Sequence, residues 1–166
     1  MAEAGGEEGG LSTMDINDDL LVVGEKTHEF TLKHYVTGQD TKVRIEVYSA
    51  ESEQAQQLQR KLHDDDVARL AAAHAAGRER AEPLSYVERE QLIVSVAIAR
   101  TASWSGLTEN GAPFAFTPQN AQRLYSKAAW IRDAVISESA DLGKFLPPPA
   151  PPSAPTQTRS SDSTSG

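Results

Sequence analysis

The segment from Thr101 to Val135 constrains the fold more than any other part of the chain, because it holds both tryptophans and two of the four phenylalanines. It also carries the plainest turn and helix signals. Asn110-Gly111 is the commonest signal for a two-residue turn with positive φ. Thr117 is a good N-cap, and Pro118 is a good first residue for the helix that we expect to follow.

The aromatic side chains of this segment have two interpretations. They form a local core that fastens the loop onto the preceding helix, as is common in small cores, or they form an exposed anchor surface for a protein partner. Both interpretations can hold for different members of the set. The candidate partner-binding or structural anchors are Trp104, Phe114, Phe116 and Trp130, together with Leu58 and Leu62 of an earlier helix.

A β-hairpin is predicted at residues 28–48. Apolar and polar side chains alternate there on both sides of a turn at Thr37-Gly38, which is the period of a half-buried strand. Val43, Ile45 and Val47 share one face of the second strand. A lone hairpin is marginally stable in water, so this apolar face needs a helix or another chain to cover it.

About four helices are expected after the hairpin. The first has Ser49 or Ser52 as its N-cap and a sparse apolar stripe, so it should be mostly solvated or face a partner. The second is apolar over a wide surface and should be mostly buried. Residues 26–146 therefore predict a single α+β domain, mainly α-helical. The predicted helices are residues 50–76, 84–102, 118–128 and 130–142.

Both ends of the chain are expected to be disordered. Residues 1–25 hold seven acidic residues, no lysine or arginine and no aromatics, so they cannot offset the entropy of ordering. The apolar run at residues 20–23 is the exception, since it could pair as an edge strand or dock onto a partner. Residues 147–166 are rich in proline and then in serine and threonine. They predict an extended spacer followed by coil, or a ligand for a proline-recognition domain.

No group of residues predicts catalysis, and we expect a protein that is not an enzyme. The chain has no cysteine, which excludes thiolate chemistry. His63-Asp64-Asp65-Asp66 resembles metal ligands, but consecutive helical residues point around most of a turn and do not converge on one ion. The body of the chain is nearly neutral, which argues against nucleic acid, and no long apolar run predicts a membrane span. We therefore expect no catalytic, metal-binding or cofactor-binding residues.

The order of these features resembles a small protein of siphophage-like phages and prophages that is described as a tail assembly chaperone. The resemblance covers residues 28–146. Its most specific part begins at Trp104-Ser105-Gly106, continues through Asn110-Gly111 and ends with Phe116-Thr117-Pro118-Gln119-Asn120-Ala121.

The resemblance implies a non-enzymatic protein that needs no cofactor. Such chaperones bind the tape measure protein and recruit tail tube subunits during tail morphogenesis, in the cytoplasm of the host. Self-association is a further option. The alternative that stays open is a structural subunit of the tail or neck that is retained in the mature virion.

Overall fold

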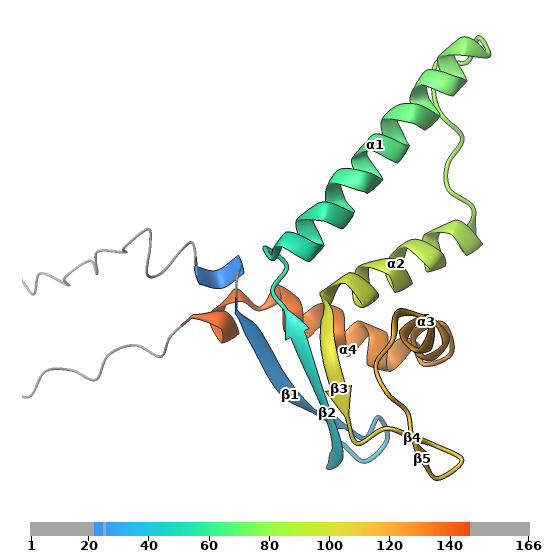
Figure 1. The fold of residues 1–166 in the computed structure, drawn as a ribbon. Coiled ribbons are helices and arrows are strands. Elements are labelled where there is room, and N and C mark those ends of the chain that lie inside the picture. Colours follow the sequence, from blue (N-terminus) through green and yellow to red (C-terminus); the bar gives the residue numbers. More distant parts are fainter. Residues whose placement is uncertain (1–21, 25, 147–166) are drawn as a thin grey trace, which may run out of the picture.

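The computed structural model describes residues 22–24 and 26–146 (Figure 1). The expected disordered tails lie outside the described residues, apart from the turn at Val22–Gly24. The chain has an α+β fold, as predicted. Its elements are η2 Val22–Gly24, β1 Thr27–Lys33, β2 Asp40–Tyr48, α1 Glu53–Ala75, α2 Tyr86–Arg100, β3 Thr101–Ser105, β4 Thr108–Glu109, β5 Ala112–Pro113, α3 Pro118–Lys127, α4 Ala129–Ala140 and η3 Leu142–Phe145.

The main sheet has three antiparallel strands in the order β1-β2-β3. Strands β1 and β2 form the predicted hairpin, but the sequence patterns missed β3. The helix expected at residues 84–102 ends at Arg100, and Thr101 begins an extended segment. Pairing with β2 explains the difference, because it places Trp104 opposite Ile45. Thr101 and Trp104 are both buried as a result, and such tertiary packing overrides local helix propensity.

A single apolar core lies between the sheet and helices α2, α3 and α4 (Figure 1). Ile45 and Val47 of the predicted apolar face are fully buried, so helices of the same chain cover the hairpin. Helix α2 contributes Val94 and Ala97, whereas Val87 near its start is exposed although the helix was expected to be mostly buried. The remaining buried core side chains are Val23, Leu32, Trp104, Ala121, Tyr125, Ile131, Val135 and Phe145.

The described end of the short apolar run at residues 20–23 does not form the edge strand that the sequence suggested. Val22–Gly24 forms a 3-10 turn, and the side chain of Val23 is buried in the core. These three residues therefore belong to the domain rather than to the acidic arm.

The cap and turn signals in the sequence are confirmed. Ser52, rather than Ser49, caps α1, and its hydroxyl accepts a hydrogen bond from the backbone N–H of Ala55. Thr117 caps α3 in the same way. Asn110 and Gly111 have φ values of 52° and 81°, as a two-residue turn with positive φ requires.

Candidate functional site

Trp104 belongs to the core, which is the first of its two interpretations. Its side chain is 8% exposed, and its indole N–H donates a 2.6 Å hydrogen bond to the carbonyl oxygen of Phe114. The ring of Phe116 meets the indole edge-on, with centroids 4.9 Å apart, and Tyr125 packs on it at 6.1 Å. Phe114 and Phe116 are half-buried in this packing. Trp104 of β3 and the loop residues Phe114 and Phe116 therefore build the fold.

Trp130 lies in a different, exposed position. Its side chain is 38% exposed at the start of α4, and its ring packs against Tyr35 with centroids 5.4 Å apart. Tyr35, at the tip of the hairpin, stacks in turn on His34. The sequence did not single out Tyr35, because a tyrosine at a strand end is equally compatible with burial and with exposure. These side chains make a small aromatic surface beside β1.

Helix α1 carries the remaining candidates, Leu58 and Leu62. Figure 1 shows this 23-residue helix extending away from the sheet, with its N-terminal end near the top of β2. Ala73 is its one buried residue. Leu58 and Leu62 are half-buried, and both point toward α2 rather than into the main core. The prediction of a sparsely packed first helix is therefore confirmed.

Helices α1 and α2 diverge, and an open cleft of about 660 Å³ lies between them. Its walls are largely apolar. Leu62 is common to this cleft and to a smaller adjoining cavity of about 190 Å³ that continues toward Ala50. The residues around the larger cleft are Leu62, Asp65, Asp66, Ala68, Arg69, Leu84, Glu88, Gln91, Leu92 and Ser95.

Polar side chains form the rim of this cleft. They also connect α1 to the linker before α2 and cap the start of α2. Arg69 donates to Asp66 at 3.1 Å and also to the backbone carbonyl of Glu82 in the linker that leads to α2. Glu88 closes a capping box with Ser85. Hydrogen bonds from Ser85 lower the pKa of Glu88, with a smaller contribution from the charge of Arg69. The rim therefore carries a fixed negative charge at neutral pH.

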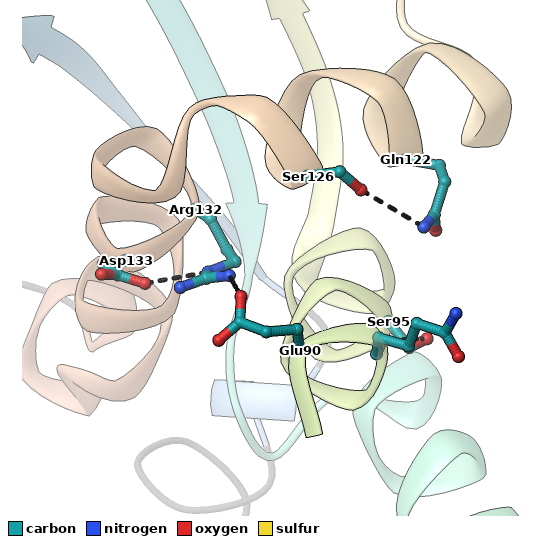
Figure 2. Close-up of polar contacts among 7 residues, drawn as sticks. Glu90, Ser95, Gln122, Ser126, Arg132 and Asp133 are labelled. Carbon is teal, nitrogen blue, oxygen red and sulfur yellow. Dashed lines mark hydrogen bonds and ion pairs between the residues drawn. The ribbon is translucent and has the colours of Figure 1, made fainter. Parts of the chain in front are cut away.

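The polar contacts inside the domain hold elements together. Arg132 of α4 is 7% exposed and donates to Glu90 of α2 at 2.7 Å and to Asp133 at 3.0 Å (Figure 2). The hydrogen bond to Glu90 raises the pKa of Arg132. Burial raises the pKa of Tyr125 to about 12, and its hydroxyl lies 2.7 Å from that of Thr101. The contacts of Arg132 with Glu90 and of Tyr125 with Thr101 each join two packed elements, which is a structural role.

Over residues 22–24 and 26–146, no group of three or more His, Asp or Glu side chains could hold a metal ion. The side chains of His63 and Asp64 to Asp66 are exposed along α1. None of the described helices is both long and apolar enough to cross a membrane.

No protein-family model, curated protein or solved structure matches this chain. The resemblance to tail assembly chaperones therefore rests on the sequence features of residues 28–146, of which residues 104–121 are the most specific part. The cleft between α1 and α2 is the feature of the described residues from which a function can be argued. It brings the predicted Leu62 together with Leu84 and Leu92, which the sequence did not mark because their position depends on how the linker folds back.

Proposed function

We propose that this protein is a non-enzymatic tail assembly chaperone of a siphophage-like phage. It binds the tape measure protein and tail tube subunits during tail morphogenesis. The observation that supports this function best is the open apolar cleft between α1 and α2, because a transient protein-binding role needs an accessible apolar surface.

Helix α1 has an architecture that suits partner binding. It extends for about 34 Å at 1.5 Å per residue, yet Ala73 is its one buried residue. The stability of helices in proteins comes mostly from packing of an apolar face. Leu62 of α1 and Leu92 of α2 are only half-buried and line the cleft, so part of such an apolar face stays accessible there. A partner segment that fills the cleft gives α1 the packing that its own domain does not.

The shape and charge of the cleft indicate the kind of segment that fits. Two diverging helices with apolar walls match the binding mode in which an amphipathic helix lies in a groove. Asp65, Asp66 and Glu88 are on the rim, and Arg69 is the one basic residue there. Complementarity therefore favours a partner helix with basic side chains beside its apolar stripe.

Co-expression with the tape measure protein of the same genome tests the proposal. We expect the tape measure protein to co-purify with this chain and to gain solubility from it. If this chain neither co-purifies with the tape measure protein nor changes its solubility, the chaperone function is wrong.

Mass spectrometry of purified particles separates the chaperone from the alternative, a structural subunit of the virion. A chaperone leaves the tail when assembly is complete, so we expect finished particles to lack this chain. Recovery in amounts comparable to a tail subunit would support the structural role instead.

A further inference from the structure

Strand β1 forms an outer edge of the main sheet, and none of the described strands pairs with its free side (Figure 1). The strand is seven residues long, contains no proline and alternates regularly between outward and inward side chains. A free strand edge presents unpaired N–H and C=O groups, which makes it a template for pairing with another chain. The side chains along β1 indicate which strand fits beside it.

On the solvent-facing side of the sheet, β1 carries opposite charges placed evenly about Thr31. Glu29 lies two residues before Thr31 and Lys33 lies two residues after it, and all three side chains are exposed. In an antiparallel pair of two β1 strands centred on Thr31, Glu29 of each copy lies opposite Lys33 of the other. Two cross-strand ion pairs form in this arrangement.

Other registers of the same two strands are less favourable. Centring the pair on Glu29 places two carboxylates opposite each other, and centring it on Lys33 does the same with two ammonium groups, which is destabilising. Centring it on Phe30 or Leu32 loses both ion pairs. A shift by one residue puts the apolar face of one strand against the polar face of the other. The pattern of β1 therefore selects a single register for a second copy.

The inward side of β1 fits the same register. It places Phe30 of each copy beside Leu32 of the other, so both cross-strand pairs on this face are apolar. A groove of about 450 Å³ runs below the edge, between β1 and one side of α4. Trp130 and Ala134 line it from α4, four residues apart on one helix face. The Phe30 and Leu32 side chains of an added strand project toward this groove.

We propose that two copies of this chain associate through β1 as a two-fold symmetric dimer in which the two sheets join into one. Within a single copy, Glu29 already pairs with Arg44 at 3.3 Å. In the dimer, Glu29 lies between Arg44 of its own chain and Lys33 of the second copy. Helix α1 extends away from this edge (Figure 1), so the dimer surface and the α1–α2 cleft are separate.

Sedimentation velocity of the full chain over a concentration series tests the dimer. Wild-type protein should sediment as a dimer that dissociates on dilution. Lys33→Glu places like charges opposite each other and should raise the dissociation constant by about 5-fold or more. The double variant Glu29→Lys with Lys33→Glu should bind more tightly than Glu29→Lys alone. Lys42→Glu reverses an exposed charge on β2 and serves as the matched control, with no change expected.

Cross-linking tests the register without relying on the strength of an ion pair. The chain has no cysteine, so Thr31→Cys introduces a single thiol at the proposed two-fold axis. A short thiol-specific cross-linker should join two Thr31→Cys chains efficiently and should join two Lys42→Cys chains poorly. A wild-type protein that stays monomeric at every concentration overturns the proposal. So does a dimer that resists Lys33→Glu and cross-links equally at both positions.

Discussion

The indole N–H of Trp104 donates a 2.6 Å hydrogen bond to the carbonyl oxygen of Phe114, which ties β3 to the loop that precedes α3. This relationship predicts that Trp104 supports the fold. Trp104→Ala removes a buried ring and leaves the Phe114 carbonyl without its donor, so we expect a loss of about 3–5 kcal/mol in the free energy of unfolding. Denaturant titration measures it.

Trp104→Phe separates the hydrogen bond from the packing. It keeps most of the apolar contact with Phe116 and Tyr125 but has no N–H to donate. We expect an intermediate loss of about 1–3 kcal/mol. A Trp104→Ala protein with unchanged stability and impaired partner binding would show instead that Trp104 is a binding anchor.

Gly106 and Gly111 both have positive φ, but only Gly106 is sterically confined. A Cβ atom at residue 106 would stand 2.2 Å from the carbonyl oxygen of Lys42, whereas residue 111 has open space around it. Gly111→Ala should therefore cost about 1–2 kcal/mol, from backbone strain alone. Gly106→Ala should cost clearly more, because the backbone of β2 must shift as well. Equal stability of the two variants, measured by thermal unfolding, would disprove the steric account.

Glu46, on the solvent-facing side of the sheet, should make the stability of the fold depend on pH in the acid range. Its carboxylate accepts hydrogen bonds from Thr27 at 2.6 Å and from Ser103 at 2.8 Å, and these lower its pKa below the ordinary value of 4.5. Because the pKa is lower in the folded state, ionised Glu46 stabilises the fold above about pH 4.5. This contribution is lost as the pH falls through the lowered pKa.

Glu46→Gln should therefore weaken the dependence of unfolding free energy on pH below about pH 4.5. Thr27→Ala should act in the same direction, since it removes the donor with the largest effect on the pKa. Denaturant titrations at several pH values check both variants. Slopes that match the wild type would rule out this role for Glu46.

The ion pair between Glu90 and Arg132 should stabilise the packing of α2 on α4. Glu90→Gln leaves the buried guanidinium of Arg132 with Asp133 as its remaining charged partner. We expect a loss of about 1–3 kcal/mol in unfolding free energy. Asp65→Asn is the control, because its pairing with Lys61 at 4.0 Å is exposed and should contribute little. The prediction fails if the two variants are equally stable.

Local sequence signals predicted the hairpin, the caps and the turns because each depends on a few adjacent residues. The alternation of β2, the N-caps Ser52 and Thr117, and the Asn110-Gly111 turn are of this kind. Strand β3 was missed because Thr101 follows a helix without a breaker and becomes extended only through pairing with β2.

The candidate site was only partly predictable. The sparse stripe of α1 marked Leu58 and Leu62, but the cleft depends on the angle between α1 and α2. That angle is set by contacts such as that of Arg69 with the linker. Whether the aromatic residues are core or exposed was likewise decided by tertiary packing, which buries Trp104 and leaves Trp130 partly exposed.

Binding of the tape measure protein by two α1 variants tests the proposed chaperone function most directly. Leu62 lines the cleft, whereas Val67 is exposed and lies about 140° around the helix from it. Leu62→Gln should lower the affinity for the tape measure protein by about 10-fold or more, equivalent to about 1.4 kcal/mol. Val67→Gln, an equally polar change on the same helix, should bind like the wild type. Equal binding by both variants, with the fold intact, would contradict the proposal that the cleft between α1 and α2 holds the partner.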